Sequence, residues 1–317
     1  MEAKDCNSKH VFFNQTSIPD SFDECCIEID KFINQHSTDG RKIVLITSGG
    51  TTVPLESRTV RFIDNFSSGT RGSASAEYFL SHDYAVIFLH RHKSLEPFSR
   101  HINRQHFIDI LQLTPENEIM EFLFSVKDEH KEKLSVVLKQ FQSIEKENLL
   151  LKLEFTSLGD YLHILKAACE KLNTVGDKAM LYLAAAVSDF YIPKADMSEH
   201  KIQSSNGPLE LKLQLVPKML EPLVKDWVPS AFIISFKLET DKDILISKSR
   251  QALDKYKHQL VIANELEKRK REVTIVSTDT VTPIILTEEE VRLGIEIESI
   301  IVKEILKLHD NFISTKH

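Results

Sequence analysis

The 317-residue sequence predicts an α/β protein with a doubly wound, Rossmann-like and mostly parallel sheet. Three observations predict this fold. Several short runs are almost continuously apolar, which is typical of strands covered on both faces. Amphipathic helical segments lie between several of these runs. Motifs rich in Gly, Ser and Asn follow the runs, at the edge where open α/β sheets bind ligands.

The composition is that of an ordinary globular protein, with 42% hydrophobic residues, 27% charged residues and a net charge of -7. The only short basic cluster, 267–271, begins with an acid, so we expect no nucleic-acid partner. No run approaches the roughly 18 apolar residues of a membrane span, so we expect no membrane partner. Four cysteines without CxxC spacing and a polar N-terminus predict reduced thiols and a cytoplasmic location. No histidine pattern supports a metal site.

Residues 1–40 are predicted to form an N-terminal helical extension, because apolar residues recur at steps of three and four over 21–33. Residues 41–317 are predicted to form a single α/β domain. Its buried strands are expected at 43–46, 84–89, 181–187, 232–236 and 260–263. Helices are expected at 71–81, 160–172 and 241–256, the last one capped by Thr240 or Asp241. Two further strands, 273–276 and 283–286, precede a capping box at Thr287 that opens a long helix to about Leu308.

Two regions interrupt the alternation of strands and helices. Residues 105–158 carry many charges, and we predict a helical insertion there. Residues 190–217 are predicted to form a projecting β-hairpin flap. Alternating leucines over 209–215 indicate a half-buried strand, and Asn206-Gly207 before them is a strong hairpin-turn signal. Lys201 lies on the first arm of this flap.

Two motifs near the start of the domain contain glycines. The first, 47–51, places Gly49 after the first strand, where a bare backbone either approaches a ligand or simply turns. The second, 65–72, leads into a helix whose N–H groups offer a phosphate seat, although a small-residue helix start has the same look. About 20 residues separate Ile46 from Gly69, and no acid follows Leu89. A nicotinamide-binding fold has a short first loop and that acid, so both features count against a dehydrogenase.

Three further motifs follow later strands. Asp189 ends a run of small residues, where it either binds a ligand or caps a loop. Phe236 either stacks on a nucleobase or belongs to the core. Asn264 either bonds a base or ribose or makes a turn. Because all five motifs fall at or just after the carboxyl ends of strands, we expect them to share one cleft, as in a nucleotide-using enzyme.

Longer runs in this order resemble the phosphopantothenoylcysteine synthetase family, in its separate, monofunctional eukaryotic form. The resemblance covers about residue 42 to the final helix and is weakest between 105 and 175. It rests on five runs, which are 47–51, 60–69, 184–191, 201–204 and 234–241.

The resemblance implies a ligase of coenzyme A biosynthesis that joins 4'-phosphopantothenate to L-cysteine. The reaction would pass through an acyl-nucleotide and release a nucleoside monophosphate and pyrophosphate. ATP is the implied nucleotide, with CTP left open, and Mg²⁺ would accompany the phosphates. A homodimer is also implied. Two other classes remain as alternatives: a nicotinamide- or flavin-dependent oxidoreductase and a non-catalytic nucleotide-binding regulator.

The resemblance also implies the roles of individual residues. The nucleotide phosphates and ribose would be held by Gly49, Ser67, Gly69 and Gly72. The base would be faced by Phe236 and Asn264. The phosphopantothenate site would be lined by Ala185, Ala186 and Asp189.

Three polar residues complete the implied site. Asn65 would contact the substrate carboxylate or the acyl intermediate. Lys201 would assist acyl-nucleotide formation. Arg61 would reach across a dimer interface to the neighbour's substrate phosphate. One position departs from the family pattern: Thr70, followed by Arg71, stands where relatives often carry a basic residue.

Overall fold

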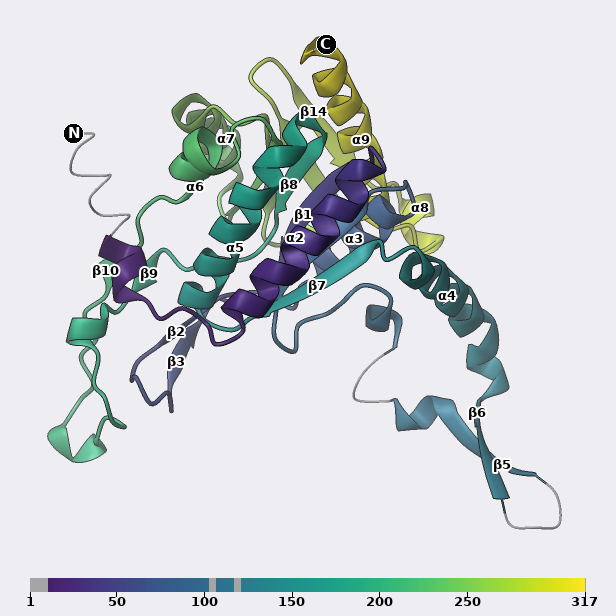
Figure 1. The fold of residues 1–317 in the computed structure, drawn as a ribbon, viewed down its shortest axis with the longest axis horizontal. Helices are drawn as coiled ribbons and strands as arrows, with labels where there is room; N and C mark the ends of the chain where they lie inside the picture. The colour runs from purple at the N-terminus through teal and green to yellow at the C-terminus, as the bar shows by residue number, and fades with distance from the viewer. Residues whose placement is uncertain (1–10, 103–106, 117–120, 317) are drawn as a thin grey trace.

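The computed structural model describes residues 11–102, 107–116 and 121–316 (Figure 1). Residues 1–10 of the predicted N-terminal extension therefore lie outside the described part. One eight-stranded sheet forms the core, in the order β14-β13-β12-β11-β8-β1-β4-β7. The strands from β12 to β7 are parallel, and β13 and β14 are antiparallel at one edge. The strands span Ile43–Ser48 (β1), Ala85–Arg91 (β4), Leu150–Phe155 (β7), Ala179–Leu183 (β8), Phe232–Glu239 (β11), Leu260–Glu265 (β12), Glu272–Val276 (β13) and Val281–Ile285 (β14).

Helices cover both faces of this sheet, which confirms the doubly wound α/β prediction. Alternate residues of β1 enter two different cores: Ile43 and Leu45 pack with α2 (Phe22–Thr38) and α5 (Leu158–Leu172), whereas Val44 and Ile46 pack with α3 (Thr70–Leu80) and α9 (Ile297–Lys316). In Figure 1, α2 and α5 lie in front of the sheet. The apolar runs are continuous because both faces of each strand are buried.

Local capping signals set two helix starts as predicted. The Asp241 side chain accepts the Asp243 N–H at the start of α7 (Lys242–Tyr256). Thr287 and Glu290 form a capping box. The long helix predicted after Thr287 is wrong, however, because α8 covers only Glu288–Arg292 and α9 begins anew at Ile297. Gly294 lies between them with φ +70°, a left-handed conformation that ends helices.

The prediction of a helical insertion at 105–158 is wrong, because the segment contains three strands as well as a helix. It contains the antiparallel hairpin β5 (Leu111–Glu116) and β6 (Glu121–Val126), helix α4 (Asp128–Lys146) and then β7. Residues 105–106 and 117–120 of this segment lie outside the described part. β7 is an edge strand of the main sheet, so charged Lys152 and Glu154 remain on it and hide the apolar run expected of a buried strand.

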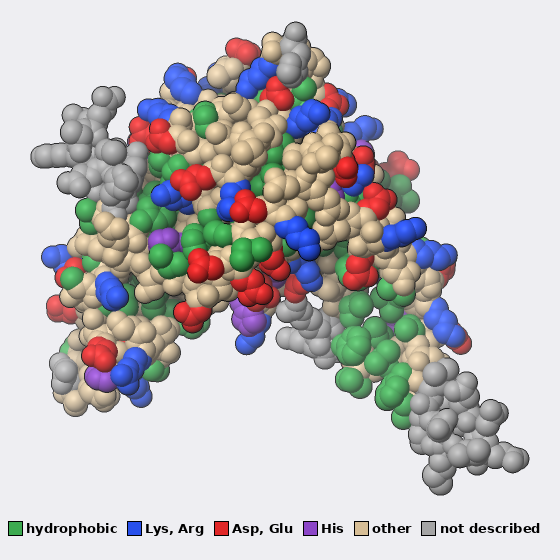
Figure 2. All heavy atoms as spheres, in the orientation of Figure 1, with side chains coloured by type: hydrophobic (Ala, Val, Ile, Leu, Met, Phe, Trp, Pro, Cys, Tyr) green, Lys and Arg blue, Asp and Glu red, His purple; other side chains and the backbone are tan. Residues whose placement is uncertain are grey.

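The two arms of the flap at 190–217 pair with each other only at the base, and farther out Ser198 bridges to Glu56. At the base, β9 (Phe190–Tyr191) and β10 (Gln214–Leu215) form a short antiparallel ladder, and the rest of the arm projects from the body at the lower left of Figure 1 and Figure 2. The half-buried strand predicted over 209–215 is wrong, because Leu209, Leu211 and Leu215 are all exposed. Alternation by itself does not form a strand where no second layer covers the apolar side.

Two other features shape the ligand edge of the sheet. A small hairpin, β2 (Thr52–Pro54) and β3 (Phe62–Asp64), lies beside the flap and was not predicted. The strand predicted at 181–187 extends too far, since β8 ends at Leu183 and the alanines that follow it belong to an irregular loop segment. Among the described residues, no helix is both long enough and apolar enough to cross a membrane.

Candidate active site

Backbone hydrogen bonds join the loops after β1 and β8 at the carboxyl edge of the sheet. Ala186 donates its N–H to Gly49 O at 2.8 Å and accepts from the Thr51 N–H at 3.0 Å. Thr51 in turn accepts from the Asn65 N–H at 3.1 Å. These backbone bonds satisfy the polar groups of the irregular segment after β8, which explains why its ladder stops early. They also bring the first three sequence motifs into contact.

Glycine is required where these loops approach other chain segments. Gly49 has φ +84°, and a Cβ there would lie 2.7 Å from Cβ of Arg91. At Gly72, inside α3, a Cβ would lie 2.5 Å from Cβ of Ser48. Both contacts are too short for any larger residue, so Gly49 lets the loop after β1 approach the end of β4, and Gly72 lets α3 approach the end of β1.

The start of α3 is built as a compact polar turn. Gly69 precedes the helix with φ +83°, and its carbonyl accepts hydrogen bonds from the hydroxyls of Ser48 at 3.1 Å and Ser73 at 2.9 Å. The Ser67 hydroxyl accepts the Gly69 N–H at 3.4 Å. The positive end of the helix dipole therefore points toward the loop after β1, where an anion would be stabilised.

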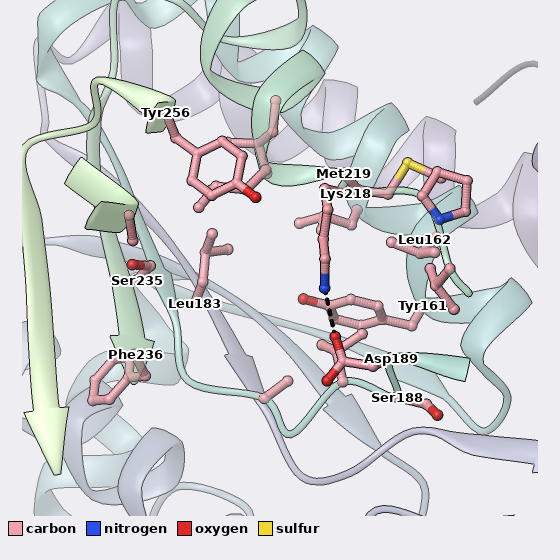
Figure 3. Close-up of a pocket in the computed structure, with 18 of the residues that line it drawn as sticks. Tyr161, Leu162, Leu183, Ser188, Asp189, Lys218, Met219, Ser235, Phe236 and Tyr256 are labelled. Atoms are coloured by element: carbon pink, nitrogen blue, oxygen red, sulfur yellow. Dashed lines mark hydrogen bonds and ion pairs between the residues drawn. The ribbon is translucent and has the colours of Figure 1, made fainter. Parts of the chain in front are cut away.

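A cavity of about 480 Å³ opens beside these loops, on the side of the sheet that carries α5 (Figure 3). Three of the residues predicted from sequence line it, namely Ala185, Asp189 and Phe236, and the Phe236 ring itself packs into the core on the opposite side of the sheet. They come from the segment after β8 and from β11, the neighbouring strand in the sheet. A smaller adjoining cavity of about 200 Å³ is lined by both Asp189 and Asn65.

Lys218 is a cavity residue that the sequence motifs did not reveal. Its Nζ donates to the Asp189 carboxylate at 2.7 Å, and Figure 3 shows the side chain reaching into the cavity. The Val216 N–H also donates to the Asp189 carbonyl at 2.9 Å. No spacing pattern could have identified this lysine, because its partner lies 29 residues earlier, at the other end of the flap.

Phe236 and its neighbour Ser235 point to opposite sides of β11. The Phe236 ring packs edge-on against Tyr182, with ring centroids 4.9 Å apart. The Ser235 hydroxyl is 2.8 Å from Nε2 of His258, whose pKa is lowered to about 4 by burial. A partly exposed ring at this edge suits stacking on a flat base, and the neutral imidazole keeps Ser235 in place.

Asn264 lies on the α3 side of the sheet rather than in the cavity of Figure 3. Its Oδ1 accepts from Arg71 at 3.3 Å, and its Nδ2 donates to Ile262 O at 3.1 Å. Arg71 also pairs with Glu298 at 2.9 Å. Asn264 is thus tied to the start of α3, next to the glycine turn. The site consequently has two halves, one on each side of the sheet edge.

Arg61 and Lys201 are not among the residues that line these cavities. Lys201 is exposed on the flap. Arg61 pairs with Glu56 at 2.8 Å and donates to Ile202 O at 3.2 Å, so it lies beside Lys201 at the junction of the flap and the β2–β3 hairpin. The structure therefore gathers most of the predicted site at one edge and leaves these two cations at the junction of the flap and the β2–β3 hairpin.

Comparison with known proteins gives a consistent family. The chain matches the family described as DNA/pantothenate metabolism flavoprotein C-terminal domain over residues 39–121 and 163–306. It is 48% identical over 289 residues to human phosphopantothenate–cysteine ligase, covering 90% of this chain and 92% of the relative. It is 42% identical to the phosphopantothenate–cysteine ligase CAB2 of Saccharomyces cerevisiae, covering 96% and 86%.

Solved structures agree with these sequence matches. A Cab2 mutant in complex with phosphopantothenate-cysteine superposes with a TM-score of 0.85 at 42% identity, covering 96% of this chain and 98% of that one. A Streptococcus pneumoniae protein of the same flavoprotein family shares the fold alone, with a TM-score of 0.57 at 20% identity. The oxidoreductase alternative finds no support in these relatives. On its fold, on the motifs gathered at one sheet edge and on identities of this size over nearly its whole length, the chain belongs to the phosphopantothenate–cysteine ligase family.

Proposed function

We propose that this protein joins 4'-phosphopantothenate to L-cysteine in an ATP-dependent reaction of coenzyme A biosynthesis. The observation that carries this proposal is the 48% identity to the human ligase over 90% of the chain. Ala185 and Asp189 lie on one side of this sheet edge and the Phe236 ring lies on the other, which supports placing the reaction at this edge.

The chemistry requires activation of a carboxylate, which is a poor electrophile because it is already anionic. Attack of this carboxylate on the α-phosphate releases pyrophosphate and forms an acyl-nucleotide. The cysteine amine then attacks the acyl carbon and releases the nucleoside monophosphate. The first step brings anions together, so aligned N–H donors and cations lower its barrier most.

The two halves of the site suit the two reactants. On the α3 side, Gly49, Ser67, Gly69 and Gly72 would hold the phosphates and ribose, with Phe236 and Asn264 at the base. On the α5 side, Ala185, Ala186, Asp189 and Asn65 would hold the acid. Their shared edge is where carboxylate and α-phosphate would meet, and holding them in line contributes several kcal/mol of barrier reduction, within the roughly 7–11 kcal/mol attainable by orientation.

Mg²⁺ would enter with the nucleotide. Among the described residues, no group of three or more His, Cys, Asp or Glu side chains is arranged to hold a metal. We therefore propose that phosphate oxygens and water hold most of the Mg²⁺ coordination, as they commonly do in nucleotide sites. The Mg²⁺ ion would neutralise part of the phosphate charge. We assign ATP rather than CTP from the likeness to the eukaryotic ligases.

A homodimer in the cytoplasm is the assembly that we propose. Arg61 and Lys201 lie together where the β2–β3 hairpin meets the flap, and neither lines this chain's own cavities. A cation placed there suits contact with the substrate phosphate of a second subunit, which is the role assigned to Arg61.

The test is a mass-spectrometric assay with 4'-phosphopantothenate, cysteine and either ATP or CTP. The expected product is the cysteine amide, with AMP and pyrophosphate in equal amounts and faster turnover with ATP. Absence of the amide with both nucleotides would overturn the proposal, and faster turnover with CTP would overturn the ATP assignment alone. Asn65→Asp should accumulate acyl-nucleotide, and Arg61→Ala should weaken phosphopantothenate binding.

A further inference from the structure

Lys218 is the cavity residue whose charge is not used by the roles described so far. It lies where the chain returns from the flap, and its side chain spans part of the cavity toward Asp189 and Tyr161 (Figure 3). Lys237 also lines this cavity but pairs with Glu239 at 3.2 Å. Lys218 is therefore the lysine of this cavity whose ammonium group faces the proposed acid site.

The position of Lys218 is set by the base of the flap. The β9–β10 ladder pairs Leu215 with Phe190, and the next backbone bond joins Val216 to Asp189. Lys218 follows two residues later, so the same short ladder places its side chain opposite the Asp189 carboxylate. Backbone hydrogen bonds thus fix the point from which the Lys218 side chain extends toward Asp189.

The ion pair itself is weakly held. The side chains of Lys218 and Asp189 are 57% and 65% exposed, and pairs this exposed contribute little to stability because water screens them. The buried pair of Arg100 with Glu77, only 9% and 13% exposed, has no such freedom. An incoming anion could replace Asp189 as the partner of Lys218 with little loss.

We propose that Lys218 releases Asp189 and binds the carboxylate of the acid substrate in this cavity, which makes it a substrate-binding residue of the ligase reaction. This inference rests on the proposed function. The phosphate seat at the start of α3 lies on the other side of the sheet, whereas Lys218 faces Ala185, Asp189 and the adjoining Asn65 cavity. The ammonium group offsets the repulsion that the carboxylate meets from Asp189 and from the nucleotide phosphates.

The experiment compares two ligands that differ in one charge: 4'-phosphopantothenate and its primary amide. Their dissociation constants are measured by calorimetry on the full-length protein and on Lys218→Met. We expect the variant to bind the acid at least tenfold more weakly and the amide equally well. In turnover, KM for the acid should rise while KM for the nucleotide stays the same. Lys218→Arg should recover much of the affinity.

Lys225→Met is the matched control. Lys225 is also 57% exposed and ion-paired, with Glu221 at 3.0 Å, but it does not line this cavity. It should bind both ligands as the unchanged protein does. The unfolding midpoints of Lys225→Met and Lys218→Met should both equal that of the parent protein. Weaker binding by Lys218→Met would then not be caused by a less stable fold.

Each other result overturns the inference in a distinct way. Equal weakening for acid and amide would mean that Lys218 contacts the substrate phosphate or backbone, not the carboxylate. Unchanged affinity for both would leave Lys218 as a partner of Asp189 only. Failure of the parent protein to form product would instead remove the proposed function, whereas normal parent turnover with an unaffected variant removes only this role of Lys218.

Discussion

The Glu56 carboxylate is buried at the junction of the flap and accepts a hydrogen bond from the Arg61 guanidinium at 2.8 Å. It also accepts the backbone N–H groups of Arg61 at 3.0 Å, Val60 at 3.3 Å and Ile202 at 3.4 Å. Burial by itself would raise the pKa of Glu56, but these hydrogen bonds outweigh it and hold the pKa below its usual range. One anion thus ties the β2–β3 hairpin to the flap segment that carries Lys201.

Replacing Glu56 with Gln should loosen this junction. The amide keeps the shape but offers one acceptor oxygen in place of two, so some of the N–H donors lose their partner. We expect amide hydrogen exchange over 198–203 to accelerate at least tenfold and pyrophosphate release to slow. Glu199→Gln, an exposed flap residue, serves as the control. Parent-like exchange in Glu56→Gln would show that the flap is held by other contacts.

Lys201→Gln should slow the first chemical step. In the present structure the flap holds the Lys201 ammonium group away from this chain's cavity. Flap closure, or the flap of a second subunit, would bring this group to the reacting phosphate. We expect pyrophosphate release to fall by about 10²–10³-fold, as for loss of one transition-state donor. Lys212→Gln, exposed on the same flap, should leave the rate unchanged. Equal rates for both variants would remove Lys201 from the mechanism.

Arg100→Met should destabilise the fold. Arg100 lies between Glu77 and Glu296, with N–O distances of 2.7 and 2.5 Å, and its own side chain is only 9% exposed. Removing it leaves the nearly buried Glu77 carboxylate beside the partly buried Glu296 carboxylate, which costs about 3–5 kcal/mol. Urea unfolding measures the loss. Lys131→Met breaks a pair that is largely exposed and should change the free energy of unfolding by less than about 1 kcal/mol.

Acid should weaken the fold through its buried histidines. Burial lowers the pKa of both His258 and His309 to about 4, below the roughly 6.5 of the unfolded chain. Between these values only the unfolded chain takes up the protons. The stability from the neutral rings is therefore complete above pH 6.5 and falls as pH drops toward 4.

Between these two pKa values, each histidine should lower the free energy of unfolding by up to about 1.4 kcal/mol for every unit that the pH falls. Urea unfolding at pH 7, 6 and 5 measures this slope, and the two rings together should take up nearly two protons on unfolding between pH 6 and 5. His258→Gln should reduce the uptake by about one proton. A free energy of unfolding that stays constant from pH 7 to 5 would contradict the assignment.

Gly49→Ala should be far more damaging than Gly176→Ala. Both glycines have positive φ, at +84° and +68°, so alanine strains the backbone at either position. Only at Gly49 does the new Cβ also collide with Arg91, whereas nothing lies within 4 Å of the Cβ position at Gly176. We expect an extra loss of about 1–3 kcal/mol and weaker nucleotide binding for Gly49→Ala. Equal melting temperatures would show that the loop relaxes freely.

Sequence patterns predicted most of the sheet because burial on both faces leaves a local mark. Residues 43–46 are apolar at every position, and each faces one of two cores. Helix caps such as Thr287 are equally local, since the bond spans three residues. The edge strand β7 escaped prediction for the opposite reason: half of its surface faces solvent, so Lys152 and Glu154 break the run.

What the sequence by itself determined is therefore the doubly wound sheet, its main helices and the glycine and serine motifs at the strand ends. Only the tertiary structure decided that Lys218 meets Asp189 across the base of the flap, and that Glu56 bonds Ile202 from 146 positions away. The physical reason is range. Burial and capping act between neighbours along the chain, whereas these pairs exist only after the sheet has brought distant segments to one edge.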